Sequence, residues 1–215
     1  MLKHQQQFWD MPNRIVLLIG GYGSGKTYIG ALKSLYMSYL NSPVPGMYIS
    51  PSHQLATKTI IVTLKELCQR ADIDYTYNQQ RSEFTFHNWG GTIWLGSGDK
   101  PDSLRGPNIG WAVIDEPFIQ KREVFEQMIA RVRHPEAKKS QIFLTGTPES
   151  LNWGWVIAND PNMDIGTIQA STLDNPHLPD DYKESLLQAY SEEQIEAYVH
   201  GKFVNLTQGR VYKDF

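Results

Sequence analysis

The sequence predicts an α/β fold in which a mainly parallel central sheet is flanked by helices and carries a small antiparallel extension. Apolar segments of strand length alternate along the chain with amphipathic segments of helix length, which is typical of a parallel sheet with crossover helices. Within residues 73–95 the hydrophobic period changes from helical to two, and polar turns separate short aromatic and β-branched runs. We therefore expect residues 73–95 to add strands to the edge of the main sheet.

The expected elements begin with residues 14–19, a continuous apolar run that ends in glycines, as a buried parallel strand should. An amphipathic helix at 26–40 follows and stops before an Asn-Ser-Pro turn. The sequence then predicts a strand at 46–50, a helix at 54–70, and short strands at 73–77, 82–86 and 92–95.

The second half continues the alternation. The predicted elements are a strand at 111–114 ending in acids, a helix at 124–131, strands at 141–144 and 165–170, and helices at 180–190 and 192–200. The closing segment is glycine-punctuated and extended. We therefore divide the chain into a domain over residues 1–200 and a C-terminal linker or tail over residues 201–215.

Composition excludes several classes of protein. The chain has 215 residues, with 20 Lys and Arg against 23 Asp and Glu, which argues against a basic nucleic-acid coat protein but leaves room for local basic patches. The single cysteine, Cys68, excludes a disulfide framework and a cysteine-built metal site, and fits a reducing compartment. No apolar run reaches the length of a membrane span, and the first ten residues lack the apolar core of a signal peptide.

A phosphate-binding loop is indicated by residues 20–27, GGYGSGKT, which match the pattern G-x-x-x-x-G-K-[ST] between a strand and a helix. Glycines let backbone N–H groups converge on a β-phosphate, and the helix N-terminus adds its positive dipole. Lys26 would bridge the β- and γ-phosphates, and Thr27 would ligate Mg²⁺. The expected nucleotide contacts are Gly21, Tyr22, Gly23, Ser24, Gly25, Lys26 and Thr27.

An acidic pair, Asp115 and Glu116, ends the strand at 111–114. Asp115 is expected beside the phosphate loop, where it would hold the water shell of Mg²⁺. Glu116 could polarise an attacking water as a general base. GTPases typically lack a base at this position, and nucleotide kinases do not need one to activate water, so the acidic pair favours nucleotide hydrolysis. The alternative interpretation is a solvated strand end without a catalytic role.

The strand at 141–144 ends in Thr145-Gly146-Thr147. It should lie next to the phosphate-loop strand, so that either Thr145 or Thr147 could reach the γ-phosphate or the lytic water. The alternative interpretation is a turn whose hydroxyls merely cap a following helix.

Together these motifs resemble the ATPase domain of a large terminase subunit, the packaging motor of tailed double-stranded DNA bacteriophages. The segments that carry the resemblance are GGYGSGKT (20–27), SLRGPNIGWAVIDEP (103–117), TGTP (145–148) and EAYVHGKFVNLTQGRVYKDF (196–215). The resemblance implies a P-loop NTPase of the additional-strand catalytic-glutamate type. In this family the last segment precedes an RNase H-like nuclease, whose metal-binding carboxylates would lie beyond residue 215.

The resemblance also implies roles for single residues. Lys26 and Thr27 become the phosphate and Mg²⁺ contacts, Asp115 the Walker B carboxylate and Glu116 the catalytic base. Thr145, Gly146 and Thr147 become the motif that couples hydrolysis to movement. The adenine-recognition Gln, aromatic residue and Arg of the family match Gln5, Phe8 and Arg14 best, although Gln6 or Gln7 would serve if the register slips.

One departure from the family concerns Tyr22, since many members carry an arginine at this position of the loop. The positive charge for the transition state must then come from elsewhere, and Arg105 is the candidate for an arginine finger supplied to a neighbouring subunit. The alternative for Arg105 is an ordinary surface salt bridge. The competing arginines are Arg81, Arg122, Arg131 and Arg133.

The function implied by the resemblance is ATP-driven translocation of double-stranded DNA into a procapsid in the host cytoplasm, with ATP and Mg²⁺ as ligands. The implied partners are the portal protein, the small terminase subunit and further copies of the chain in a ring of five. The isolated chain is compatible with a monomer in solution. The basic stretch expected to contact DNA comprises Arg131, Arg133, Lys138 and Lys139, and the alternative is an ordinary solvated surface. The rival functions are a helicase-like ATPase and a nucleotide-binding assembly module that does not hydrolyse.

Overall fold

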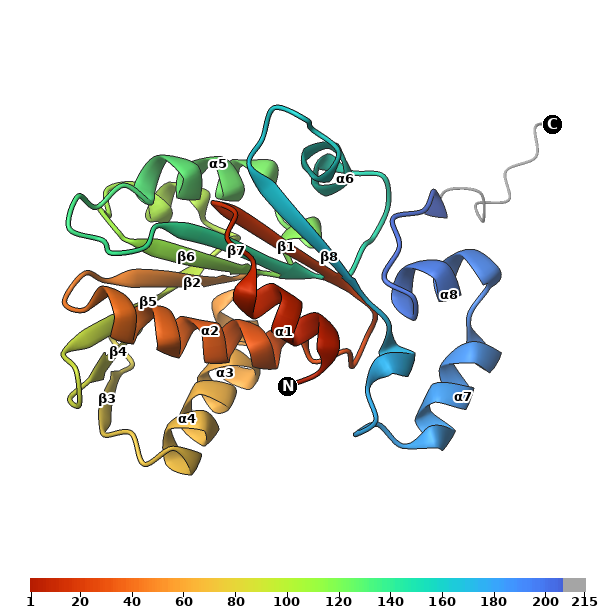
Figure 1. The fold of residues 1–215 in the computed structure, drawn as a ribbon, viewed down its shortest axis with the longest axis horizontal. Helices are drawn as coiled ribbons and strands as arrows, with labels where there is room; N and C mark the ends of the chain where they lie inside the picture. Colours follow the sequence, from red (N-terminus) through yellow and green to blue (C-terminus); the bar gives the residue numbers. More distant parts are fainter. Residues whose placement is uncertain (207–215) are drawn as a thin grey trace.

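In the computed structural model, which describes residues 1–206, a single eight-stranded sheet has the order β3-β4-β5-β2-β6-β7-β1-β8 (Figure 1). The strands are β1 (Ile15–Gly20), β2 (Gly46–Ser50), β3 (Tyr75–Asn78), β4 (Glu83–Phe86), β5 (Gly91–Ser97), β6 (Trp111–Asp115), β7 (Gln141–Gly146) and β8 (Ile165–Ala170). All neighbours from β5 to β8 in this order are parallel, whereas β3 and β4 are antiparallel additions at one edge. The predicted parallel sheet with an antiparallel extension is therefore confirmed.

Helices cover both faces of the sheet. They are α1 (Lys3–Asp10), α2 (Lys26–Asn41), α3 (His53–Lys58), α4 (Ile60–Arg70), α5 (Arg122–Arg131), α6 (Trp153–Ala158), α7 (Asp180–Ala189) and α8 (Glu192–Tyr198), with short 3₁₀ turns at Pro101–Leu104, Pro117–Ile119 and Thr172–Asp174. Figure 1 shows α1 to α4 on one face and α5 and α6 on the other, while α7 and α8 stand at the end of the sheet where β1 and β8 finish.

Strand β1 illustrates why both faces need cover. Its side chains alternate between two apolar clusters: Val16 and Leu18 pack with α1, α2 and α4, whereas Leu17 and Ile19 pack with α5 and α6. Successive side chains of a strand point to opposite faces, so a continuous apolar run is stable only between two layers of helices.

Three helical features differ from the predictions. The helix expected at 54–70 is two helices divided at Thr59, whose hydroxyl donates to the Leu55 carbonyl at 2.9 Å and whose backbone (φ −120°, ψ −87°) leaves the helical region. A side-chain bond of this kind competes with the helical ladder. Helices α1 and α6 are absent from the predictions, because α1 is mostly polar and α6 is only 6 residues long.

Within the described residues, side chains that follow the predicted boundary at residue 200 contact side chains that precede it. Lys202 forms an ion pair with Glu196, and the Phe203 ring lies 4.9 Å from the Phe118 ring. The remainder of the expected tail, residues 207–215, lies outside the described residues. No helix within residues 1–206 combines the length and apolarity that crossing a membrane requires.

The strand order brings the phosphate loop, the Asp115–Glu116 pair and the Thr145–Thr147 segment together at the carboxyl ends of the parallel strands. Strand β7 pairs with β1 on one side and with β6 on the other, in a register that sets Gly146 beside Ile19 and Thr145 beside Asp115. The expectation that the strand at 141–144 neighbours the phosphate-loop strand is thus confirmed. Because these strands are parallel, their carboxyl ends and the loops that follow them meet.

Candidate nucleotide-binding site

The phosphate loop connects β1 to α2 in a conformation that depends on glycine. Gly25, which precedes the first residue of α2, has φ +84°, and a Cβ there would come within 2.6 Å of the Gln5 amide nitrogen. Residues with a side chain rarely adopt this backbone conformation. Ser24 closes the turn, since its hydroxyl donates to the Gly21 carbonyl at 2.8 Å.

Lys26 lies inside the loop. The residue is 6% exposed, and Nζ donates to the carbonyls of Gly20 and Gly21 at 3.0 and 2.9 Å. Burial lowers the pKa of Lys26, while the charges of Glu116 and Asp115 oppose that shift. The ammonium therefore lies in the field of the two acidic residues that end β6.

Asp115 is a buried carboxyl at the carboxyl end of β6. It is 3% exposed, and one oxygen accepts a hydrogen bond from the Thr145 hydroxyl at 2.9 Å. Burial, with the neighbouring Glu116 charge, raises the pKa of Asp115 to about 7, although the Thr145 bond and Lys26 act in the opposite direction. An oxygen donor of this kind is well suited to a divalent cation, whose charge would offset the cost of burying the carboxylate.

Glu116 follows in a left-handed backbone conformation, with φ 45° and ψ 54°. Two hydrogen bonds hold it there. Its N–H donates to the Thr145 carbonyl at 2.7 Å, and its carboxylate accepts from the Thr147 N–H at 2.9 Å. The side chain is half-buried, and its carboxylate reaches the loop that follows β7.

The two threonines of the predicted coupling motif have different surroundings. The Thr145 hydroxyl is engaged by Asp115, whereas the Thr147 hydroxyl is buried and has no hydrogen-bond partner within residues 1–206. A buried hydroxyl without a partner is costly, and a ligand oxygen or water would relieve that cost.

The segment between β8 and the end of α8 packs onto the outside of the phosphate loop. The Tyr22 N–H donates to the Tyr198 carbonyl, the Thr172 hydroxyl to the Tyr22 carbonyl and the Asn175 amide to the Gly23 carbonyl, each at 2.7 Å. The Tyr22 and Tyr198 rings stack with centroids 5.1 Å apart. Sequence reasoning missed these contacts, because no fixed spacing links residues 150 or more positions apart.

Tyr22 stands at the loop position where many large terminase subunits carry an arginine, and it supplies no positive charge. Burial, followed by the charge of Glu149, raises the pKa of Tyr22 to about 12, so its hydroxyl remains neutral. Sequence reasoning also missed Glu149, which accepts a hydrogen bond from the Tyr198 hydroxyl at 3.4 Å.

A cavity of about 470 Å³ adjoins the loop at Gly25. Gln5 lines it, is 5% exposed, and donates to the Gly25 carbonyl at 3.2 Å. Gln6 is instead exposed and bonded to Asp10, and Gln7 is exposed. Of the three glutamines considered, the structure therefore brings Gln5 to the loop.

Two of the residues matched to the adenine motif do not reach this cavity. Phe8 is fully buried, with its ring 5.5 Å from that of Phe143, and belongs to the core beneath α1. Arg14 precedes the amino end of β1, about 20 Å of strand away from the loop, and donates to the Val132 carbonyl at 2.9 Å. Phe8 therefore packs beneath α1, and Arg14 lies beside the amino end of β1, so neither side chain lines the cavity.

The side-chain partners of Arg105 are acidic residues outside the loop, and the basic stretch lies at the opposite end of the parallel strands. Arg105 is exposed and pairs with Asp102 at 3.1 Å and Glu123 at 3.4 Å. Exposed pairs of this kind are weak, so the guanidinium is free to exchange partners. Arg131, Arg133, Lys138 and Lys139 occupy the end of α5 and the connection to the amino end of β7, at the edge opposite the phosphate loop.

Comparison with known proteins identifies the family. The family described as "Terminase large subunit, T4likevirus-type, N-terminal" matches residues 17–215. The chain belongs to this terminase family. The PBSX phage terminase large subunit of Bacillus subtilis (strain 168) is 30% identical over 139 residues, which are 63% of this chain and 32% of that protein.

Solved terminase structures share the fold. The large terminase of a thermophilic bacteriophage, in complex with ADP, superposes with a TM-score of 0.83 at 15% identity, over 94% of this chain and 53% of that chain. The ATPase domain of the Thermus phage P74-26 large terminase has a TM-score of 0.69 at 14% identity, over 93% and 92% of the two chains. The chain thus spans about a third of the curated terminase and about half of the ADP-bound terminase.

Proposed function

We propose that this chain is the ATP-hydrolysing motor domain of a large terminase subunit and drives double-stranded DNA into a procapsid. The observation that carries the proposal is the meeting of the phosphate loop, the Asp115–Glu116 pair and the Thr145–Thr147 segment at one edge of the sheet. A phosphate loop alone would fit several classes of nucleotide-binding protein. Glu116, tied to the end of β7, supplies a base that favours hydrolysis.

ATP would bind with its phosphates on the loop and its base in the adjoining cavity. Backbone N–H groups of Gly21, Tyr22, Gly23, Ser24 and Gly25 face the phosphates in loops of this pattern, and Lys26 adds a point charge. The Lys26 ammonium now bonds to two loop carbonyls, and phosphate oxygens would replace them. Gln5 would contact the base, since it lines the cavity beside Gly25.

Magnesium fits the oxygen donors at the same edge. Within residues 1–206 there is no cluster of three or more His, Cys, Asp or Glu side chains that could hold a metal ion. Mg²⁺ commonly takes one or two protein ligands and completes its shell with phosphates and waters, and Thr27 and the buried Asp115 supply hydroxyl and carboxyl oxygens. When bound, the ion supplies charge neutralisation on the β- and γ-phosphates.

Hydrolysis would proceed by attack of a water oxygen on the γ-phosphorus, in line with the bridging oxygen to the β-phosphorus. The new bond joins water oxygen to phosphorus, the bridging bond breaks toward ADP, and Glu116 takes the water proton. The Thr147 N–H holds the Glu116 carboxylate, and the unpartnered Thr147 hydroxyl is available to the water or the γ-phosphate. Arg105 of an adjacent subunit would neutralise charge that develops on the γ-phosphate.

The mechanical part of the proposal uses Thr145-Gly146-Thr147 as the coupling segment, because it bonds to both acidic residues. We propose a homo-oligomeric ring, of five subunits by family analogy, that works in the host cytoplasm with the portal protein and the small terminase subunit. The bacteriophage Phi-29 viral genome packaging motor assembly, at 15% identity and a TM-score of 0.58, shares the fold. Arg131, Arg133, Lys138 and Lys139 would contact the DNA backbone without reading its bases.

We further propose that residues 1–200 form the motor domain and residues 201–215 the linker toward a nuclease domain of the parent protein. Sequencing the parent gene past the codon for residue 215 would test this. A carboxylate-rich nuclease domain there would support the division, and a chain that ends without one would contradict it.

The catalytic part of the proposal is tested by phosphate release from the purified chain with ATP and Mg²⁺, at rising protein concentration and with or without double-stranded DNA. Turnover that rises with concentration, and is lost in Glu116→Ala, supports a hydrolysing ring. Tight ATP binding without turnover at any concentration would support the rival assembly module. Turnover that needs DNA but not self-association would support the helicase-like ATPase.

A further inference from the structure

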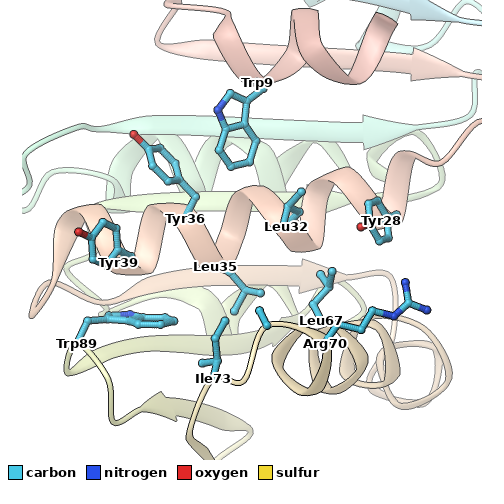
Figure 2. Close-up of a pocket in the computed structure, with 11 residues that line it drawn as sticks. Trp9, Tyr28, Leu32, Leu35, Tyr36, Tyr39, Leu67, Arg70, Ile73 and Trp89 are labelled. Atoms are coloured by element: carbon cyan, nitrogen blue, oxygen red, sulfur yellow. The ribbon is translucent and has the colours of Figure 1, made fainter. Parts of the chain in front are cut away.

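A second cavity, of about 440 Å³, adjoins the candidate base cavity and shares two residues with it, Tyr28 and Arg70. Figure 2 shows this aromatic groove along α2, between Trp9 and the end of α4, with Tyr28 and Arg70 together at one end. The shared end is the side of the groove that faces the phosphate loop, because Tyr28 belongs to the first turn of α2, two residues after Lys26. Arg70 therefore stands at the junction between an apolar groove and the nucleotide cavity.

Arg70 lacks the side-chain partners that Arg14, Arg105 and Arg122 have, and its place in the lining of both cavities sets it apart from the other unpaired arginines. Arg14 donates to a backbone carbonyl, Arg105 pairs with two acids and Arg122 pairs with Glu126 at 3.0 Å. In the described part of the chain the exposed Arg70 guanidinium has neither a hydrogen bond nor an ion pair, although it ends α4. A basic residue in the last turn of a helix gains from the helix dipole, but Lys58 shows the same arrangement at the end of α3 without lining either cavity.

None of the other residues that line the base cavity is an Asp, Glu, Lys or Arg. They are Met1, Leu2, Gln5, Gly25, Tyr28, Asn175 and His177. Asn175 is already committed, since its amide donates to the Gly23 carbonyl. Arg70 is the side chain of this wall with a permanent charge and a planar face, and a guanidinium favours stacking on an aromatic ring.

We propose that Arg70 is a base-contacting residue that closes the base end of the nucleotide site, with its guanidinium stacked on the purine ring of ATP opposite Gln5. The inference rests on the proposed binding of ATP at the phosphate loop. It assigns the phosphates to the loop and Lys26, and the base to Gln5, Tyr28 and Arg70. Arg70 then contributes to affinity for the whole nucleotide but not to affinity for its phosphate chain.

The experiment compares Arg70→Ala, Arg70→Lys and the matched control Lys58→Ala. Equilibrium binding is measured for ATP and for inorganic tripolyphosphate, which has the phosphates without the base, and steady-state hydrolysis gives KM and kcat. We expect Arg70→Ala to weaken ATP binding about tenfold, with tripolyphosphate affinity and kcat little changed. Arg70→Lys should recover only part of the loss, because an ammonium lacks the planar face. Lys58→Ala should match the wild type.

Two results would overturn the assignment. Wild-type ATP affinity in Arg70→Ala would remove Arg70 from the site, and an equal loss for ATP and tripolyphosphate would make it a phosphate contact. A wild-type chain that binds neither compound would instead refute the proposed function on which the inference rests. Thermal unfolding of each variant identifies any loss that comes from misfolding.

Discussion

The carboxylate of Glu116 accepts a hydrogen bond from the backbone N–H of Thr147 at 2.9 Å, so the proposed base is fixed to the loop that leaves β7. The Glu116 N–H donates in return to the Thr145 carbonyl at 2.7 Å. Any change in the end of β7 would therefore move the carboxylate that activates water. Because β7 pairs with both β1 and β6, the same strand end also adjoins the phosphate loop and Asp115.

The first prediction separates binding from hydrolysis. Glu116→Gln keeps an oxygen for the Thr147 N–H but cannot take a proton, so ATP affinity should persist while turnover falls by about 10²-fold or more. Lys26→Ala should abolish tight ATP binding, since Lys26 contacts the phosphates before the reaction as well as during it. Equilibrium binding and steady-state phosphate release on both variants check this. Full activity in Glu116→Gln would remove Glu116 from the role of base.

The second prediction concerns pH and the buried Asp115. Its folded-state pKa of about 7 lies above the unfolded value of 3.8, so the folded protein holds this proton more tightly. The contribution of Asp115 to the free energy of unfolding therefore decreases as pH rises from about 4 to 7. Asp115→Asn, which carries no charge, should unfold at a temperature higher than the wild type at pH 8, by roughly 5 °C, and the gap should shrink at pH 5.

Thermal unfolding of both proteins without nucleotide, between pH 5 and 8, tests this sign. A gap between the two unfolding temperatures that stays constant with pH would mean that Asp115 is not the titrating group. The same variant should lose Mg²⁺-dependent hydrolysis, because the amide cannot supply the negative oxygen donor.

Local patterns predicted the parts of the site that lie within one strand and its loop. The apolar run of β1 followed by GGYGSGKT, and the acids after β6, are contiguous signals whose backbone geometry follows from glycine content and strand period. Arg14 carries no such contiguous signal. Its spacing from Gln5 matched a family pattern, but β1 carries it to the opposite edge of the sheet from the loop.

Helix α1 and the packing around the phosphate loop depend on contacts between distant segments, which the sequence could not predict. Helix α1 is largely polar, yet Lys33 donates to the Trp9 carbonyl at 2.6 Å and Phe8 packs on Phe143. The same holds for the packing of Tyr198 on Tyr22, since neither residue carries a signal for the other. Contacts between distant segments leave no periodic trace in a single sequence.

The third prediction tests the contact between the phosphate loop and the C-terminal segment. A Cβ on Gly21 would come within 2.3 Å of the Val199 carbonyl oxygen and 2.4 Å of the Thr172 hydroxyl, so Gly21→Ala must displace backbone. Overpacking of this kind costs about 1–3 kcal/mol, and the unfolding temperature should fall by several degrees. Gly30→Ala in α2 is the control, because its Cβ would meet nothing nearer than 3.4 Å. Equal unfolding temperatures for the two variants would contradict the contact.

The last prediction concerns Arg105 as a residue supplied to a neighbour. Its two partners, Asp102 and Glu123, are themselves exposed, so leaving them costs little and the guanidinium can reach another subunit. With Tyr22 in the loop, a lone subunit has Lys26 but lacks an arginine for the charge that develops on the γ-phosphate. Arg105→Ala should lower turnover by at least about 10²-fold while ATP affinity changes little, because a finger acts mainly in the transition state.

Mixing Arg105→Ala chains with Glu116→Ala chains decides whether the finger acts between subunits. Each variant is expected to be inactive alone. In a mixed ring, an Arg105→Ala subunit keeps Glu116 and can receive the intact Arg105 of a Glu116→Ala neighbour. With head-to-tail interfaces and random mixing at equal amounts, about a quarter of the junctions would hold both groups, so turnover should recover to about that fraction of the wild type. No recovery despite demonstrated co-assembly would mean that Arg105 acts within its own subunit or has no part in hydrolysis.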